Sequence, residues 1–133
     1  KTLNLGLEDR LESKVGLLSG GQRQALTLLM ATLVEPKLLL LDEHTAALDP
    51  KTAAQVLSLT TDIVHKRNLT TLMITHNMKD ALACGNRLIM LHDGKILIDV
   101  KGEEKKHLTI KDLLAMFEKA AGSELNSDAL LLS

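Results

Sequence analysis

Hydrophobic and polar residues follow two patterns along the chain, and together these predict an α/β fold. In some segments apolar residues recur near helical spacing, while short continuous apolar runs separate those segments. Such a run is typical of a strand in a parallel sheet that is buried on both faces. The predicted helices cover residues 20–34, 51–66, 78–83 and 110–121, with a short one at 7–14, and the predicted strands cover 38–41, 70–75, 87–92 and 95–100.

The order of these elements predicts how the strands pair. A strand, a helix and a strand over residues 38–75 form a βαβ unit, which joins parallel strands. Asp93-Gly94 between the last two strands predicts a tight β-hairpin. The charged run KGEEKKH at 101–107 is interpreted as a solvated linker, followed by a carboxyl-terminal helix and a tail.

Composition and charge narrow the class of protein. The 133 residues are the size of one domain, and 45% of them are hydrophobic, which favours a folded chain over disorder. Sixteen basic against seventeen acidic residues and only 1% aromatics argue against a nucleic-acid-binding protein. Cys84 is the single cysteine, so an internal disulfide is excluded. No apolar run is long enough to span a membrane. The chain starts in mid-pattern without Met, so we expect it to be a piece of a longer protein.

Two adjacent glycines, Gly20 and Gly21, stand where the first long helix is predicted to begin. Ser19 and Gln22 around them fit a capping box, which explains the outer pair of this motif but not the glycines. Glycine costs about 1 kcal/mol relative to alanine inside a helix. Bare backbone N–H groups at a helix start can bind a phosphate. From the motif alone, the capping and the phosphate hypotheses remain equally open.

Candidate chemistry also follows the two predicted parallel strands. Asp42 and Glu43 end the first strand, and adjacent acids repel each other unless a cation or a proton relieves the charge. A Mg²⁺ ion held through Asp42, with Glu43 as a general base toward water, would relieve it. His76 follows the second strand. A lone histidine there usually has a structural role, but parallel strands bring their carboxyl ends to one sheet edge, where ligands bind.

Four motifs in one order resemble the ATP-binding-cassette (ABC) ATPase family, whose fold is a P-loop NTPase. LSGGQ (18–22) resembles its signature, LLLLDE (38–43) its Walker B strand and catalytic glutamate, ALD (47–49) its D-loop, and ITHN (74–77) its switch histidine. The resemblance covers essentially the whole chain. It implies that residues 1–17 end a helical subdomain, 18–100 form the carboxyl-terminal part of the ATPase core, and 101–133 form a linker, a helix and a tail.

The resemblance implies a role for each matching residue. In that family two domains hold two ATP molecules head to tail between them. Ser19, Gly20, Gly21 and Gln22 are then expected to contact the γ-phosphate of ATP bound by the opposite protomer. Asp42 is expected to hold Mg²⁺, Glu43 to polarise the attacking water, His76 to bind the γ-phosphate, and Asp49 to lie at the dimer interface.

The chain departs from the family pattern in two places. His44 follows the glutamate, where many relatives carry proline; it is interpreted as a tolerated turn residue, with an influence on Glu43 as the alternative. The P-loop, G-x-x-x-x-G-K-S/T, is missing, because the only Gly-Lys pair, Gly94-Lys95, precedes Ile96. The Q-loop is missing as well. We therefore expect these residues alone to be inactive toward ATP.

The expected function is the ATPase subunit of an ABC transporter, and an importer is favoured because no membrane segment is fused to the chain. The expected cofactors are ATP and Mg²⁺. The expected partners are a second ATPase protomer, a membrane permease and, for an importer, a substrate-binding protein. No nucleic acid is expected among the partners. The expected location is cytoplasmic, on the inner face of the cell membrane. The alternative is a soluble relative acting on chromosomes or ribosomes, but heptad repeats and excess basic charge are missing. A non-catalytic regulatory relative is expected to lose Glu43 or the signature, and both are present.

Overall fold

The computed structural model describes residues 6, 9 and 12–131, with only the helical backbone for residue 121 and residues 123–131. The chain forms two compact units, Lys1–Thr75 and His76–Ser133. The first contains a 3₁₀ turn at Val15–Leu17, α1 (Gly20–Thr32), β1 (Leu39–Asp42), α2 (Pro50–Lys66) and β2 (Thr71–Ile74). The second contains α3 (Met78–Ala83), β3 (Arg87–His92), β4 (Lys95–Lys101), α4 (Gly102–His107) and α5 (Ile110–Leu131).

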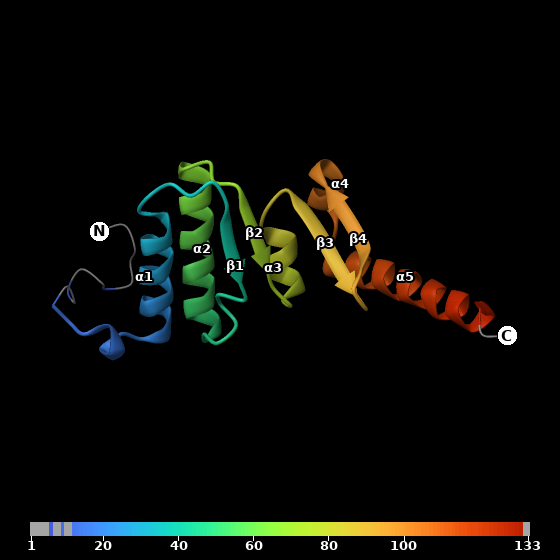
Figure 1. Ribbon diagram of the computed structural model, residues 1–133, viewed down its shortest axis with the longest axis horizontal. Coiled ribbons are helices and arrows are strands. Elements are labelled where there is room, and N and C mark those ends of the chain that lie inside the picture. Colours follow the sequence, from blue (N-terminus) through green and yellow to red (C-terminus); the bar gives the residue numbers. More distant parts are fainter. Residues whose placement is uncertain (1–5, 7–8, 10–11, 132–133) are drawn as a thin grey trace. The chain divides into compact units, whose positions relative to one another are not determined.

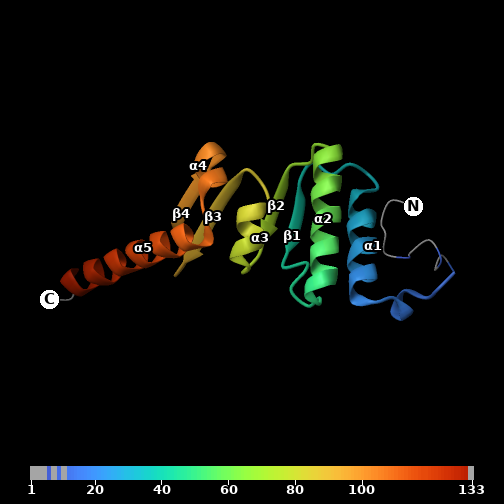
Figure 2. The same ribbon diagram turned by 180° about the vertical axis from the view of Figure 1, so that it is seen from behind.

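The first unit confirms the predicted βαβ arrangement. β1 and β2 are parallel, in a register that runs from Leu39 opposite Thr71 to Asp42 opposite Ile74, and α2 connects them. α1 and α2 lie side by side next to the two strands (Figures 1 and 2). The core between helices and strands consists of buried leucines with partly buried neighbours from α2 and β2: Leu28, Leu39, Leu41 and Leu69, with Leu59, Ile63, Val64 and Met73.

The prediction that these strands are buried on both faces is wrong. Leu39 and Leu41 face the helices and are buried, whereas Leu40, which alternates with them, is 64% exposed. Leu72 and Ile74 of β2 share its face and are 53% and 52% exposed. Successive side chains of a strand point to opposite faces, and α1 and α2 cover only one of them. Within the described part of the chain, the second face stays open to solvent.

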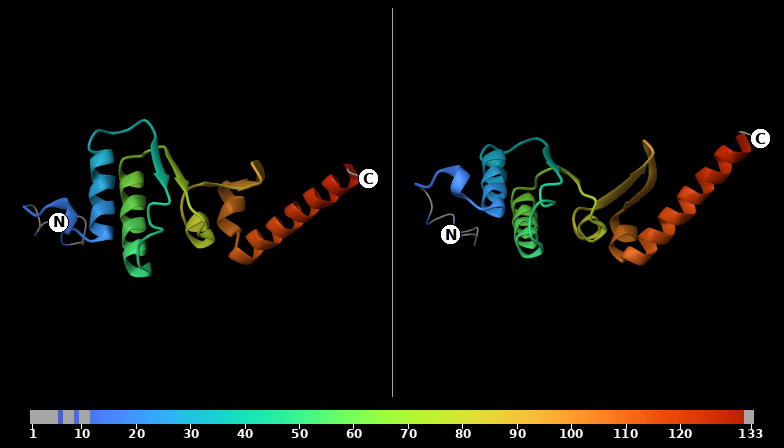
Figure 3. Two further views of the ribbon diagram at one scale, coloured as in Figure 1. Left: turned by 60° about the horizontal axis from the view of Figure 1, so that its bottom comes forward. Right: turned by 90° about the horizontal axis from the view of Figure 1, so that it is seen from below.

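The second unit is built on the predicted hairpin. β3 and β4 are antiparallel, and Asp93 and Gly94 both have positive φ angles, 46° and 75°, as a type I′ turn requires. α5 packs against β4 and α3, so that Leu113 of α5 is completely buried. Figure 3 shows α4 leading into α5 beside the hairpin.

The run at 101–107 is not a solvated linker, because residues 102–107 form α4. Acidic residues in its first turn and basic residues in its last turn match the helix dipole. Lys105 is 4% exposed, and its Nζ donates hydrogen bonds to the carbonyl oxygens of Leu82 (2.7 Å), Cys84 (2.7 Å) and Gly85 (3.0 Å). These carbonyl groups lie at the carboxyl end of α3. Their hydrogen bonds with Nζ offset the cost of burying the lysine.

Two helix boundaries differ from prediction, and one predicted helix is only partly described. α1 ends at Thr32 rather than residue 34, ahead of Glu35-Pro36, and α5 continues to Leu131 rather than ending at 121. Of the helix predicted at 7–14, residues 7, 8, 10 and 11 lie outside the described residues. Of its described residues, residue 9 lies in a 3₁₀ turn, residue 12 in a turn and residue 13 in a bend. Lys14 is extended (φ −62°, ψ 138°) and directly precedes the 3₁₀ turn at Val15–Leu17.

Candidate functional site

The start of α1 confirms the predicted capping box. Gln22 donates its backbone N–H to Ser19 Oγ (3.3 Å), and Ser19 donates its backbone N–H to Gln22 Oε1 (3.0 Å). Among the described residues, no acceptor pairs with the backbone N–H of Gly20 or Gly21. These two groups, at the positive end of a 13-residue helix, have the chemistry of an anion site.

The structure adds a packing reason for Gly21 that the sequence did not reveal. A Cβ atom at Gly21 would lie 2.1 Å from Thr52 Cγ2 of α2, far inside van der Waals contact. At Gly20 the nearest atom is Leu48 Cδ2 at 3.1 Å, the end of a flexible side chain. Gly21 therefore lets α1 and α2 approach each other, and the predicted signature touches residues 48–52 around the predicted D-loop. No local pattern in the sequence indicates this contact.

The two adjacent acids lie at the carboxyl end of β1, as predicted. Asp42 pairs with Ile74 in the sheet, and the side chains of Asp42 and Glu43 are exposed. Glu43 adopts a left-handed backbone with φ 44°. Its N–H donates to the carbonyl of Ile74 (2.9 Å), and its own carbonyl accepts from the N–H of Ala46 (3.0 Å). The bond to β2 and the turn after β1 thus fix both backbone groups of Glu43.

Asp42 and Glu43 can supply only one or two of the ligands that a Mg²⁺ ion needs. Mg²⁺ is commonly bound by one or two carboxylates together with substrate phosphates, so an exposed Asp42 at a strand end is a suitable ligand. Within the part of the chain that the structure describes, no three His, Cys, Asp or Glu side chains are grouped to hold a metal by themselves. The donor set therefore suits a metal that arrives with a phosphate ligand rather than a metal held by protein alone.

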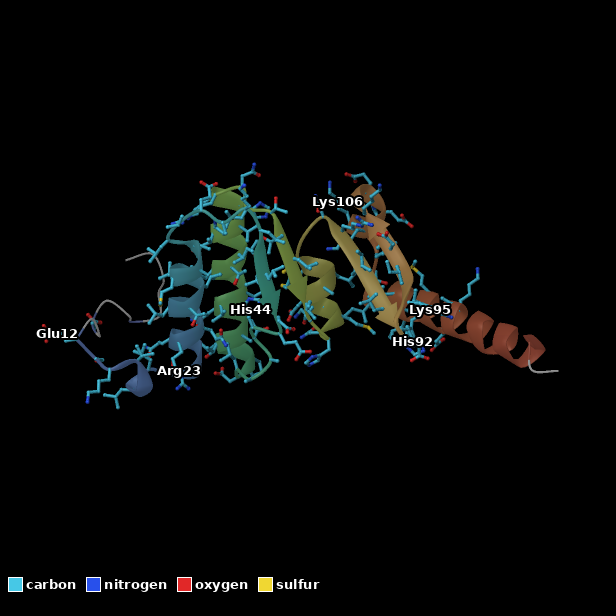
Figure 4. All side chains as sticks on the ribbon, viewed as in Figure 1. Glu12, Arg23, His44, His92, Lys95 and Lys106 are labelled. Atoms are coloured by element: carbon cyan, nitrogen blue, oxygen red, sulfur yellow. The ribbon has the colours of Figure 1, made fainter. Side chains whose placement is uncertain are left out.

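His44 makes the contact that sequence reasoning missed. Its side chain is half-buried next to α2 (Figure 4), and its Nε2 lies 3.0 Å from Thr60 Oγ1. Thr60 is buried on α2, sixteen residues further along the chain. A hydrogen bond at this separation has no signature in a local pattern.

Asp49 caps the start of α2, where the Asp-Pro pair predicts that the helix begins. Its Oδ1 accepts a hydrogen bond from the backbone N–H of Thr52 (3.1 Å). Hydrogen bonds from the side chain and backbone of Thr52 lower the pKa of Asp49 below its usual 3.8. This carboxylate therefore has a structural role as a helix cap, whatever its role at an interface.

His76 follows the end of β2 by two residues and is the first residue of the second unit. Its side chain is exposed. Asn77, the next residue, caps α3 by accepting from the N–H groups of Lys79 (3.0 Å) and Asp80 (3.3 Å). The predicted switch histidine thus stands at the junction between β2 and α3. A hollow elsewhere in the second unit is lined by Asn86, Arg87, Lys101 and Gly102, none of which is a predicted site residue.

The described helices include none that is both long and apolar enough to cross a membrane.

Comparison with known proteins shows that the chain is similar to proteins of one family. Residues 2–46 match the family model described as ABC transporter. The chain is 57% identical over 118 residues to the tyrosine transport ATP-binding protein of Clostridioides difficile, which covers 89% of the chain and 47% of that protein. It is 40% identical over 129 residues to methionine import ATP-binding protein MetN 2 of Oceanobacillus iheyensis, which covers 93% of the chain and 36% of that protein.

A solved structure of an ABC transporter in an inward-facing conformation is also similar. Its TM-score is 0.68 at 35% sequence identity, and the match covers 86% of this chain and 45% of that one. The chain thus spans less than half the length of these relatives. The α/β fold with its parallel strand pair agrees with a P-loop NTPase of which only a part is present. On this evidence the chain is similar to ATP-binding proteins of the ABC transporter family and fits a part of their nucleotide-binding domain.

Proposed function

We propose that these 133 residues are the carboxyl-terminal part of the nucleotide-binding domain of an ATP-hydrolysing ABC transporter subunit, of the importer type. The observation that carries the proposal is the pair of exposed, adjacent carboxylates of Asp42 and Glu43 at the carboxyl edge of a parallel strand pair. The relatives reported above are named for tyrosine transport and methionine import, which supports an importer. The transported substrate of this protein is not part of the proposal.

Two residues of the first unit, Glu43 and Asp42, have different proposed roles in phosphoryl transfer. Glu43 accepts the proton of the attacking water, because its carboxylate is exposed and its backbone is held by hydrogen bonds on both sides. Asp42 would hold Mg²⁺, which neutralises charge on the phosphate oxygens. The proposal needs a P-loop from a preceding part of the longer protein, since the sequence has none.

The start of α1 acts on a different ATP molecule. Ser19, Gly20, Gly21 and Gln22 are proposed to face the γ-phosphate of ATP bound by a second protomer. The backbone N–H groups of Gly20 and Gly21, for which the described residues offer no acceptor, are the donors of this contact. Asp49 caps α2 between Leu48 and Thr52, the residues that lie beside Gly20 and Gly21, which supports a place at the same dimer interface. His76 is proposed to donate a hydrogen bond to the γ-phosphate of the ATP in its own protomer.

The remaining partners follow from the transporter assignment. A membrane permease carries the substrate, and a substrate-binding protein delivers it if the transporter is an importer. The ATPase subunit is then placed in the cytoplasm, on the inner face of the cell membrane. The three-part division at residues 17 and 100 is also part of the proposal.

Replacing Glu43 in the longer protein tests the proposed function. Glu43→Gln keeps the shape of the side chain but cannot accept a proton, so kcat for ATP hydrolysis should fall by about 100-fold or more while ATP binding persists. A dimer with trapped ATP should accumulate in gel filtration with ATP and Mg²⁺.

Glu35→Gln is the matched control, because Glu35 is an exposed glutamate on the loop before β1. It should hydrolyse ATP at the rate of the unchanged protein. If Glu43→Gln also hydrolyses ATP at nearly that rate, Glu43 is not the general base and the proposal is wrong.

A further inference from the structure

The backbone of Glu43 stores strain at the proposed catalytic position. Its φ of 44° places it in the left-handed region, which costs a non-glycine residue free energy and persists only where the surroundings hold the residue there. The backbone N–H of Glu43 donates to the carbonyl of Ile74 on the neighbouring strand β2. The carbonyl of Glu43 accepts from the N–H of Ala46 within the turn. On the other side of Glu43, the side chain of the next residue, His44, forms a hydrogen bond with Thr60 of α2.

The surroundings of Thr60 favour one direction for the His44–Thr60 hydrogen bond. The Thr60 hydroxyl lies 2.8 Å from the carbonyl oxygen of Val56, to which it can donate its only proton. In that arrangement the Thr60 oxygen accepts from His44, and Nε2 of His44 carries a proton. Both the Nε2–H neutral ring and the imidazolium can make this bond, whereas the tautomer protonated at Nδ1 alone cannot.

Thr60, the partner of His44, lies on a rigid part of the fold and can therefore hold the turn in place. Thr60 is 4% exposed, and α2 is a 17-residue helix whose Val56 is completely buried, so the acceptor is part of the core. The hydrogen bond to Thr60 therefore ties residue 44, directly after Glu43, to α2.

We propose that His44 is a positioning residue for Glu43, which it holds in the left-handed turn through its Nε2–H bond to Thr60. The inference rests on the proposed function of Glu43, but the contact itself is independent of ATP. Loss of the bond lets the turn relax toward an ordinary backbone and displaces the Glu43 carboxylate. A displacement of about 1 Å can cost a reaction up to about 100-fold in rate.

Substitutions at both ends of the bond test the proposal. In the longer protein, His44→Ala and Thr60→Val should each lower kcat for ATP hydrolysis by about tenfold or more, with KM for ATP within about twofold. The double variant should be no slower than the slower single one, because both remove the same bond. His44→Gln should restore most of the rate, since its side-chain amide can offer an N–H near the position of Nε2.

Thr61→Val is the matched control on the same helix. The Thr61 hydroxyl donates to the carbonyl of Leu57 (3.0 Å) as Thr60 donates to Val56, but the structure gives it no bond to His44. Its kcat should equal that of the unchanged protein. Circular dichroism of each variant establishes that it is folded, and His44→Ala, a change on a half-buried turn, serves if Thr60→Val unfolds.

Nuclear magnetic resonance of the 133-residue chain provides a readout without ATP. Long-range ¹H–¹⁵N spectra should show His44 protonated at Nε2. The backbone resonances of Glu43 should shift in His44→Ala and Thr60→Val but not in Thr61→Val.

The outcomes separate this proposal from the proposed function. If Glu43→Gln is inactive but His44→Ala and Thr60→Val keep kcat within about twofold, the positioning role is wrong and the catalytic role of Glu43 stands. If the unchanged longer protein does not hydrolyse ATP, the proposed function is wrong, and unshifted Glu43 resonances would then also overturn the positioning of Glu43 by His44.

Discussion

Gly21→Ala probes the close approach of α1 and α2. The added Cβ would lie 2.1 Å from Thr52 Cγ2, while Thr52 Cβ and Val56 Cγ2 are at 3.6 and 4.0 Å. Only the methyl group of Thr52 therefore stands in the way. Overpacking of this kind costs about 1–3 kcal/mol, whereas alanine in place of glycine favours a helix by up to about 1 kcal/mol. The unfolding free energy should fall by about 1–2 kcal/mol on balance.

Thr52→Ser isolates the clash. Serine lacks Cγ2 but keeps the hydroxyl that bonds to Asp49, so the cap of α2 is retained. With Cγ2 gone, the nearest atom to the new Cβ is at 3.6 Å, an ordinary contact. Gly21→Ala should therefore no longer destabilise the chain when Thr52→Ser is present, and the two changes should couple by about 2 kcal/mol.

Urea unfolding of the 133-residue chain, followed by circular dichroism, measures these free energies; the sequence has no Trp or Tyr for fluorescence. Gly20→Ala is the control, because its Cβ meets only the flexible end of Leu48 at 3.1 Å. Equal stability of Gly21→Ala and the unchanged chain, or no rescue by Thr52→Ser, would refute the packing argument. In the longer protein the rescued double variant should still turn over ATP slowly, since a methyl group remains where a phosphate is proposed to approach.

Two further predictions concern the ends of α2 and α3. Lys105→Met should destabilise the 133-residue chain by about 2 kcal/mol, because three carbonyl groups lose their donor, whereas Lys106→Met, which removes an exposed pair with Glu103, should cost less than about 0.5 kcal/mol in the same urea titration. Because hydrogen bonds from Thr52 lower the pKa of folded Asp49 below 3.8, its ionised form stabilises the fold above that pH and this contribution is lost as the pH falls through the folded pKa. The stability difference between the unchanged chain and Asp49→Asn should therefore shrink from pH 5 to pH 3, and a constant difference would contradict the role of the ionised cap.

The elements that the sequence predicted well are those set by local patterns. The capping box at Ser19, the Asp49-Pro50 helix start and the Asp93-Gly94 turn each depend on residues a few positions apart, and all three are present. The apolar runs likewise placed Asp42 and Glu43 at the end of a parallel strand.

The features that the sequence did not predict depend on contacts between distant segments. The sequence pattern places Lys105 in a solvated run, because its acceptors lie at the carboxyl end of α3, about twenty residues earlier in the chain. The contact of Gly21 with Thr52 and the bond between His44 and Thr60 are also invisible to periodicity. The exposed face of β1 and β2 differs from prediction for another reason, since an apolar run indicates burial but not which covering segment provides it.

The most direct test of the central claim, that this chain holds only part of an ATP site, is a titration of the 133-residue chain with a fluorescent ATP analogue and Mg²⁺. The chain carries the acids, the predicted signature and His76 but no P-loop, which supplies most phosphate contacts in such sites. We predict no saturable binding by the chain and saturable binding by the longer protein under the same conditions. Binding by the chain alone with a Kd below about 100 μM, or roughly 5.5 kcal/mol of binding free energy, would contradict the claim.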